Sequence, residues 1–583
     1  MRLVTAFLVT VCSAVLVALS LAFWAGGLNV QIAWTSLSTG ALMGAVAGRI
    51  TPCFEAKTPR LGVFAWLAAV AFTLFSLRAF CWLVFFDGNR IKFISANNLG
   101  DLSLHLTYIQ TLANGVSFWP SDPILYGTRL HYPLGVDLLN SLLTLAGLDV
   151  YRGLVLTGLL CCAATGFALW RWGGAFAVAG FLFNGGLAGF AFFESWQFAD
   201  YQNPVAWKSI PLALFVTQRG LLYAIPTGLL LMTSWRGRFF KTDSKPEWKL
   251  PFAIEILLYA SMPLFHLHTF LFLSFLLASW LVLGRNTERK SALTLISISF
   301  IPATLLVGLV SGFGESSSAL HFHPGWVREN EGFLYFWFWN FGALPLFVVA
   351  LCVMLAVNIR TQIRAAEFVF PAVAIFLLSC VVMFAPWEWD NTKLMIWCYL
   401  AILPFLWECL IARLHYGLRV ACCVLLFFSG FVSLIGGLDG RHEGYELAQR
   451  NELESVARAV KTLPVAATFA ASPIYNHPLL LNGRKIAVGY DGHLWSHGIA
   501  NYRDEEARLK SLMLGEPGWR KIAGTMNVRY IFWGTREREE FKSSTQPWKT
   551  ESRLIRHDPL FEIFDLQSLP LPREGGSGQP AGV

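Results

Sequence analysis

An aspartate and a histidine four residues apart form the pair in this chain with the clearest chemical potential. Asp101 and His105 lie in the segment GDLSLHLTYIQTLANG, directly after a long apolar stretch. At helical spacing, both side chains share one face of a short interfacial helix. A carboxylate beside apolar walls has raised basicity, which suits removal of a proton from an acceptor hydroxyl or amine. The alternative is that Asp101 only caps the helix, because Gly100-Asp101 is favourable N-cap chemistry. Spacing alone leaves both hypotheses open.

Two further charged sites lie in or beside apolar segments. Arg219, in VTQRGLLYAIPTGLL, falls about nine residues into such a segment. A lone arginine there needs a carboxylate, backbone carbonyls or a ligand phosphate as its partner. In APWEWDNTKLMIW, Asp390 or Asn391 is predicted to cap the next helix, and Lys393 adds a positive charge to its first turn. A helix N-terminus with a lysine is a good phosphate site. Trp387 either lines a lipid route, stacks on a sugar or belongs to the interfacial aromatic belt.

Four more polar residues belong to loops between apolar segments. Arg129, in FWPSDPILYGTRLHYPLG, is a candidate anion ligand with a solvated surface charge as the alternative, and Tyr132 suits the membrane interface. His266 and His268, in LFHLHTF, either join His105 near a ligand or satisfy hydrogen bonds within their own loop. No cysteine spacing resembles a structural zinc site. We therefore assign no metal ligands, and the sequence leaves open whether a divalent metal takes part.

Composition sets the class of protein. Of 583 residues, 55% are hydrophobic and only 14% are charged, and the mean hydropathy is +0.52. These values indicate a polytopic helical membrane protein. The run 251–283 is too long for one span and is interrupted by Pro263, His266 and His268, so we predict two short helices meeting at a turn. With that hairpin counted as two, about thirteen transmembrane helices are expected from apolar runs of about 20 residues. The other runs are 5–26, 31–50, 61–86, 151–171, 173–193, 210–234, 291–313, 333–357, 367–385, 395–411 and 419–437.

Basic residues in short loops predict the orientation. With the N-terminus in the cytoplasm, every basic cluster falls on the cytoplasmic side. These clusters comprise Arg49, Lys57, Arg60, Arg171, Arg236, Arg238, Lys241, Lys245, Lys249, Arg285, Arg289, Lys290, Arg360, Arg364, Arg413 and Arg419. The net charge of +8 then follows from orientation and gives no reason to invoke nucleic acid.

Three regions are expected along the chain. Residues 1–437 form the transmembrane domain, with an extracytoplasmic loop at 87–150. Residues 438–569 are predicted to form a small extracytoplasmic α/β domain, with helical stretches at 446–461 and 503–513 and β-like runs at Val465–Ala471 and Val528–Trp533. Residues 570–583, rich in Gly, Pro and Ser, are predicted to be disordered.

The arrangement resembles the GT-C superfamily of integral-membrane glycosyltransferases. The likeness rests on an Asp-bearing loop after an early span, a Tyr-Pro element, many spans and a C-terminal exported domain. The stretches GDLSLHLTYIQTLANG, DPILYGTRLHYPLG, TQRG, LFHLHTF and PWEWDNTK are also similar to poorly characterised bacterial members. The likeness covers most of 60–437. Many relatives carry a second acidic residue beside the first, whereas Leu102 follows Asp101 here.

The resemblance implies an inverting transfer of a sugar from a polyprenyl-phosphate carrier to a lipid, glycan or protein acceptor at the bacterial inner membrane. Asp101 would act as the base, and Arg219, Arg129 or Lys393 would hold the departing phosphate. Two other functions stay open. One is a non-catalytic transporter or flippase for a lipid-linked glycan, and the other is an assembly protein with a degenerate GT-C site.

Overall fold

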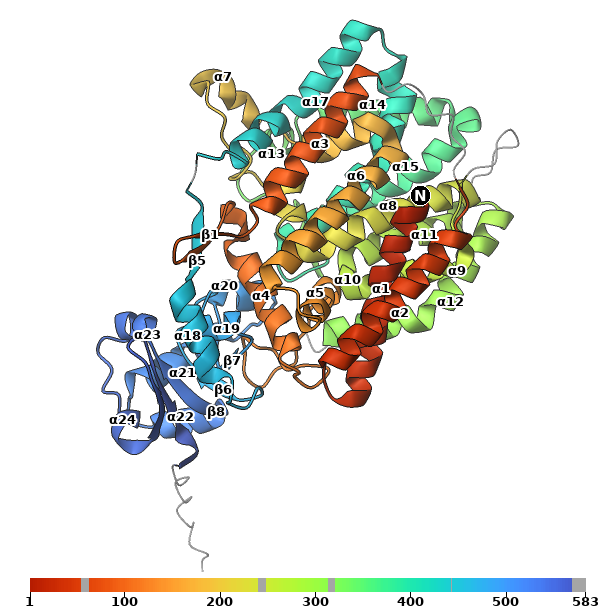
Figure 1. Cartoon of the computed structure of the whole chain (residues 1–583). Helices are drawn as coiled ribbons and strands as arrows, with labels where there is room; N and C mark the ends of the chain where they lie inside the picture. The colour runs from red at the N-terminus through yellow and green to blue at the C-terminus, as the bar shows by residue number, and fades with distance from the viewer. Residues whose placement is uncertain (54–61, 240–247, 313–319, 442, 569–583) are drawn as a thin grey trace, which may run out of the picture.

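The computed structural model describes residues 1–53, 62–239, 248–312, 320–441 and 443–568. Figure 1 shows a bundle of helices with a smaller mixed α/β unit, coloured blue, at one end of it. The predicted disordered tail at 570–583 lies outside the described residues, as do four of the basic residues used to predict orientation. These four are Lys57, Arg60, Lys241 and Lys245.

Helices occupy the segments that were predicted to span the membrane, which indicates a multi-pass membrane protein. Within the described ranges, seven helices are long and apolar enough to cross, and the bent pair α13 (Phe333–Phe341) and α14 (Leu344–Val357) makes an eighth if it is one span. The predicted count of about thirteen is therefore not confirmed. The other bundle helices discussed below are α1 (Arg2–Ala25), α2 (Val30–Ile50), α3 (Val63–Cys81), α4 (Leu99–Ala113), α5 (Gly135–Leu145), α6 (Val150–Leu182), α8 (Arg219–Phe239), α9 (Phe252–Ala260), α10 (Met262–Phe265), α11 (Leu267–Leu283), α12 (Asn286–Ser311), α15 (Ile359–Ser379), α16 (Thr392–Phe405) and α17 (Tyr416–Gly437).

α1 and α2 pack along a stripe of glycines. Gly40, Gly44 and Gly48 recur at every fourth residue of α2. A Cβ atom on Gly44 would lie 2.0 Å from Thr10 Oγ1 and 2.5 Å from the carbonyl oxygen of Ala6. The two backbones therefore approach more closely than any larger residue would allow, as small residues permit between membrane helices.

α6 bends back on itself at Gly173–Gly174, where Gly174 has φ 63° and ψ −153°. Phe72 of α3 packs against Gly166, before the bend, and its ring centroid lies 6.0 Å from that of Phe181, after the bend. These two positions would be roughly 22 Å apart on a straight helix. α6 therefore consists of two arms, but the arm after Gly174 ends at Leu182 and Val150–Leu182 is a single candidate span, so the two separate spans predicted here are not confirmed.

The long apolar run 251–283 folds as the predicted hairpin. The backbone is extended at His266 (φ −160°, ψ 107°), which ends α10 and begins α11. Tyr259 Oη lies 2.8 Å from Ser274 Oγ, and the Tyr259 ring lies 5.2 Å from the Phe270 ring. The two arms thus run side by side, with His266 at the tip.

The C-terminal unit contains a five-stranded mixed sheet in the order β7-β6-β8-β10-β9. β6 pairs in parallel with β7 and β8, whereas β8, β10 and β9 pair antiparallel. The strands are β6 (Thr468–Ala470), β7 (Lys485–Ile486), β8 (Val528–Trp533), β9 (Arg553–His557) and β10 (Glu562–Asp565), and the helices are α18 (Arg450–Val460), α19 (Pro478–Leu481), α20 (Asp491–Ser496), α21 (Tyr502–Leu514), α22 (Trp519–Thr525), α23 (Thr535–Glu540) and α24 (Trp548–Glu551).

Most of the predicted elements are present in this unit, with one error at its start. The helix predicted at 446–461 begins only at Arg450, because Tyr445–Gln449 forms the strand β5. β5 pairs with β2 (Arg90–Phe93), which in turn pairs with β1 (Phe85–Asp87). A distant pairing partner therefore decided the local structure, and the sequence around residue 446 does not reveal that partner.

Backbone hydrogen bonds join the C-terminal unit to the 87–150 segment at a second place. The N–H groups of Ile486 and Gly489 donate to the carbonyl oxygens of Pro123 and Ile124, at 3.0 and 2.7 Å. In return, the Tyr126 N–H donates to the Ala487 carbonyl oxygen at 2.9 Å. The loop thus adds an extended segment beside β7 and covers that edge of the sheet. These bonds fix the position of α20, which follows β7, relative to α4.

Candidate functional site

Asp101 lies in the first turn of α4, which begins at Leu99. Because the N-cap position is Asn98, Asp101 is not the N-cap, and the capping hypothesis fails. The half-buried carboxyl lies within hydrogen-bonding reach of the Thr217 hydroxyl. Burial raises the pKa of Asp101, and the charges of His105 and Lys393 act in the opposite direction. No salt bridge to another described residue engages this carboxylate, so it is available to a ligand.

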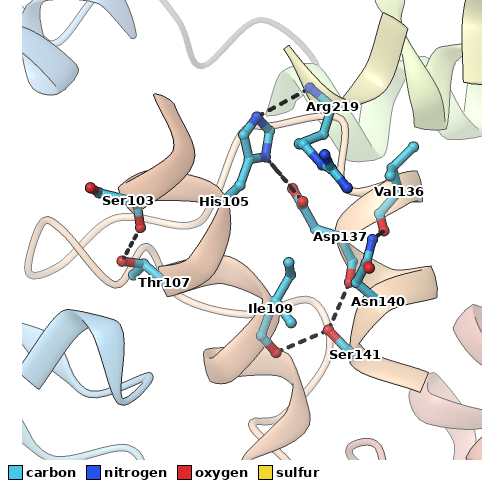
Figure 2. Close-up of polar contacts among 9 residues, drawn as sticks. All are labelled: Ser103, His105, Thr107, Ile109, Val136, Asp137, Asn140, Ser141 and Arg219. Carbon is cyan, nitrogen blue, oxygen red and sulfur yellow. Dashed lines mark hydrogen bonds and ion pairs between the residues drawn. The ribbon is translucent and has the colours of Figure 1, made fainter. Parts of the chain in front are cut away.

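His105 binds a carboxylate that the sequence-based predictions did not include. Its Nδ1 lies 2.9 and 3.0 Å from the two carboxylate oxygens of Asp137 in α5, and both side chains are buried (Figure 2). The backbone N–H of Arg219 lies 3.5 Å from Nε2 on the other side of the ring. Nδ1 is thus the donor to Asp137, and Nε2 is left as the acceptor. The rule that an ionisable residue in an apolar run marks a site applies equally to Asp137, in GVDLLNSLLTL.

Arg219 is fully buried and is the first residue of α8, so the helix begins later than the predicted span at 210–234. Its Nη2 donates to the Leu154 carbonyl oxygen at 3.1 Å, while Nε and Nη1 have no hydrogen-bond partner among the described residues. The Asp137 carboxylate lies within electrostatic reach of the guanidinium. The Arg219 guanidinium thus makes one hydrogen bond and keeps two donors without a partner among the described residues.

Lys393 is held by an ion pair within the first turn of α16. Its Nζ lies 2.8 Å from Asp390 Oδ2, and both side chains are largely buried, at 15% and 17% exposed. Asn391, one of the two predicted residues, occupies the N-cap position of α16, but its side chain makes no capping hydrogen bond. Asp390 binds Lys393, and the Asn391 side chain instead holds the preceding loop through backbone groups of residues 379–384.

The C-terminal unit brings His497, which follows α20, next to these groups. The His497 ring centroid lies 5.6 Å from that of Tyr132, whose ring lies 5.9 Å from that of His105. Burial lowers the pKa of His497 to about 4, with Asp390 opposing the shift and Lys393 adding to it. The imidazole is therefore neutral at pH 7 and carries one donor and one acceptor. No hydrogen bond joins this ring to another described residue.

Two other α20 residues touch the bundle. His493 is buried against α4, since a Cβ atom on Gly100 would lie 3.2 Å from its Nε2, and burial lowers the pKa of His493 to about 3. Trp495 is 48% exposed, and its ring lies 5.6 Å from that of Trp387. The predictions included none of these three α20-region residues. The density of aromatic and imidazole groups in DGHLWSHG was the available signal.

The remaining predicted site residues differ in their placement. His266 is the N-cap of α11, where its Nδ1 accepts from the Thr269 N–H at 3.1 Å. The His268 ring lies 5.8 Å away, and both histidines are within electrostatic reach of Lys393. Arg129 is exposed, and among the described residues no hydrogen bond or ion pair joins it to the others. It therefore stands apart.

Six residues thus converge from four parts of the chain, and we call them the Asp101 cluster. They are Asp101, His105, Tyr132, Asp390, Lys393 and His497. Within the described ranges, no group of three or more His, Cys, Asp or Glu side chains is arranged to hold a metal ion. The cluster combines an available carboxylate, a lysine and a neutral imidazole, which together suit proton removal beside an anionic leaving group.

Comparison with known proteins gives weak structural similarity and no significant sequence similarity. No family model matches the chain, and no curated protein is significantly similar in sequence. Structures of the Archaeoglobus fulgidus oligosaccharyltransferase superpose with low scores. The form tethered with an acceptor peptide containing the NVT sequon gives a TM-score of 0.45 at 13% identity, covering 81% of this chain and 69% of that one. The AglB complex with an inhibitory peptide and a dolichol-phosphate gives 0.46 at 14%, covering 88% and 75%. The apo form gives 0.47 at 12%, covering 87% and 75%. A likeness at this level identifies no activity.

The buried pair of His105 and Asp137 gives a prediction about stability. Asp137→Asn removes a buried charge that faces both His105 and Arg219, and the cost of breaking such a pair is about 3–5 kcal/mol. We expect a clear fall in the melting temperature of the purified chain in detergent. The control is Asp504→Asn, an exposed carboxylate of α21, which should melt like the parent. An unchanged melting temperature for Asp137→Asn would show that the pair does not stabilise the bundle.

Proposed function

We propose that this chain is a membrane glycosyltransferase that moves a sugar from a polyprenyl-phosphate-linked donor to an acceptor at the extracytoplasmic surface. The observation that carries the proposal is the environment of the Asp101 carboxyl. Its carboxyl is half-buried with a raised pKa, and no other described residue binds it in an ion pair. Lys393 lies within electrostatic reach, so a base and a cation face the same place. The resemblance of the Asp-bearing loop to GT-C enzymes supports the same chemistry.

In the proposed reaction, Asp101 accepts the proton of an acceptor hydroxyl or amine. The acceptor oxygen or nitrogen bonds to the anomeric carbon with inversion, and the bond from that carbon to the phosphate oxygen breaks. The polyprenyl phosphate leaves with the bonding electrons, and Lys393 stabilises the negative charge that develops on it. A raised pKa suits this role, because a general base works best when its pKa lies near the operating pH.

Other groups of the Asp101 cluster have supporting roles in the proposal. The neutral ring of His497 offers a hydrogen bond to a sugar or acceptor hydroxyl, and Trp387 with Trp495 offers aromatic faces to a sugar. His105, Asp137 and Arg219 hold α4, α5 and α8 in place instead of contacting substrate. Arg129 is the next candidate for the phosphate if Lys393 does not bind it.

Orientation forms a separate part of the proposal. The described basic residues of the short loops, such as Arg285 and Arg364, support a cytoplasmic N-terminus and an extracytoplasmic C-terminal unit. The proposed location in a bacterial inner membrane rests on the resemblance to bacterial GT-C members. We expect a reporter fused after Arg364 to report the cytoplasm and one fused after Gly440 to report the outside. Expression of both fusions as full-length protein is the control. A cytoplasmic signal from the Gly440 fusion would overturn the orientation and the extracytoplasmic site.

The test of the activity uses Asp101→Asn. This variant keeps the shape of the side chain but removes the base, so transfer of radiolabelled sugar from polyprenyl-phosphate sugars should fall by about 10²-fold or more. The melting temperature in detergent should change little, because no other described residue is bound to Asp101 in a salt bridge. Asp504→Asn serves as the matched control. If the parent binds the lipid-linked donor but transfers nothing, a transporter or an assembly protein with a degenerate site becomes the better interpretation. Near-normal transfer by Asp101→Asn would remove Asp101 as the base.

The Lys393 and Asp390 pair allows the phosphate role to be separated from a structural role. Lys393→Gln should weaken donor use by about 1.5–3 kcal/mol in kcat/KM, because one charge-assisted contact to phosphate is lost. Asp390→Asn frees Lys393 from its ion pair, so donor use should be maintained or improved. Kinetics with varied donor and fixed acceptor would measure both effects. Equal losses in the two variants would mean that the pair is needed only for folding, and Arg129→Gln would then be assayed.

A further inference from the structure

A cavity of about 670 Å³ lies at the end of α3, and it shares no residue with the Asp101 cluster. Its walls come from the last turn of α3, the hairpin of β1 and β2, and the segment after α17. The lining includes Arg78, Trp82, Phe86, Asp87, Lys92 and Glu443. The cavity thus combines aromatic side chains with two cations and two carboxylates.

The cavity lies where α3 leaves the hydrocarbon region. α3 is one of the candidate membrane spans, and only 33% of its apolar window is buried within the protein. Leu74 and Leu77 are 61% and 47% exposed along its last turns, and Trp82 and Phe86, which line the cavity, are 49% and 53% exposed. Apolar residues exposed along a span face lipid chains, and tryptophan at the end of a span marks the headgroup region. The cavity is therefore accessible to lipid headgroups.

One cation of the cavity has unused hydrogen-bonding capacity. Arg78 Nε donates to the Leu438 carbonyl oxygen at 3.0 Å, and the guanidinium carbon lies 5.3 Å from the centre of the Trp82 ring. Its Nη1 is buried and has no hydrogen-bond partner among the described residues. The nearby carboxylate of Asp439 is bound by Arg441. Nη2 lies toward the cavity wall, because a Cβ atom on Gly440, which lines the cavity, would be 3.5 Å from it. A guanidinium has N–H donors in a planar fork that matches a phosphate group, so Nη2 of Arg78 can donate to such a ligand.

The other charged groups of the cavity are one ion pair and one carboxylate that has no ion-pair partner among the described residues. Lys92 Nζ lies 2.7 Å from Asp87 Oδ2, and the Lys92 side chain is only 6% exposed, so this pair is satisfied. Glu443 is exposed and forms no salt bridge with another described residue. The uncommitted groups are therefore one guanidinium and one carboxylate, which face the same cavity.

We propose that this cavity binds the headgroup of a zwitterionic phospholipid, with its phosphate on Arg78 and its primary ammonium on Glu443. A purely anionic headgroup would leave Glu443 facing a negative charge, whereas a phosphate with an ammonium satisfies both open groups. Trp82 and Phe86 contact the glycerol region, and the acyl chains follow the exposed face of α3. A bound lipid would thereby brace the end of α3 against the β1–β2 hairpin and the start of the C-terminal unit.

The test measures retained lipid on the full-length detergent-purified chain by native mass spectrometry. Phosphatidylethanolamine and phosphatidylglycerol of equal chain length are added at equal concentration. We expect the parent to retain one phosphatidylethanolamine in preference to phosphatidylglycerol. Both Arg78→Gln and Glu443→Gln should lower that retention by about tenfold or more, since each removes one charge-assisted contact. Glu443→Gln tests the site without disturbing the fold, because the Glu443 side chain is exposed. Arg503→Gln, which alters an exposed cation of α21 outside the cavity lining, is the matched control.

Soluble probes distinguish a membrane lipid from free phosphate. Glycerophosphoethanolamine and inorganic phosphate are added as competitors, and neither should displace the lipid at the lipid's own concentration, because neither reaches the apolar face of α3. Displacement at equal concentration would overturn the assignment to a lipid. Equal retention of phosphatidylglycerol, or parent-like retention by Glu443→Gln, would overturn the assignment to a zwitterion.

Discussion

Burial of the His105 and Asp137 pair beside Arg219 is the constraint on which the geometry of the bundle depends. A charge taken out of water needs a partner within the protein, and each of these three residues belongs to a different helix. The packing of α4, α5 and α8 therefore has to bring His105 into contact with Asp137 and the Arg219 guanidinium within electrostatic reach of that carboxylate. Asp101 lies one helical turn before His105 on α4, so the same contacts that anchor His105 also determine where Asp101 stands.

His497 belongs to the Asp101 cluster because the C-terminal unit is attached to the same region twice. β5 pairs with β2 ahead of α4, and the 123–126 segment lies along β7 just before α20. Attachments on both sides restrict rotation of the unit, and α20 is thereby held over α4. His497 and Tyr132 are more than 360 residues apart in the sequence. Their rings come together because backbone pairing joins the two segments that carry them. A site assembled in this way is fixed before any ligand arrives, which is the preorganisation that electrostatic catalysis requires.

Sequence patterns identified what depends on local chemistry and missed what depends on distant partners. Apolar length located the helices, and Pro263 with the adjacent histidines located the hairpin, because these features act within one segment. Ionisable and aromatic residues beside apolar runs were predicted as site residues. The structure places four of them together, namely Asp101, Tyr132, Asp390 and Lys393. The ion pair of Lys393 with Asp390, the β5 strand and the role of His497 were not predicted. Each of them is decided by which of several possible partners is nearest, and spacing in one sequence does not determine that choice.

The ion pair of Lys393 and Asp390 sets the electrostatic surroundings of Asp101, because both charges act on that carboxyl. Because the pair has no net charge, it lowers the pKa of Asp101 less than burial raises it. An arriving phosphate would compete with Asp390 for the same ammonium. Because the phosphate is itself an anion, this exchange would leave the balance of charge beside Asp101 nearly unchanged. A lysine already held by a carboxylate is therefore compatible with a phosphate site, because one anion replaces another on the same ammonium.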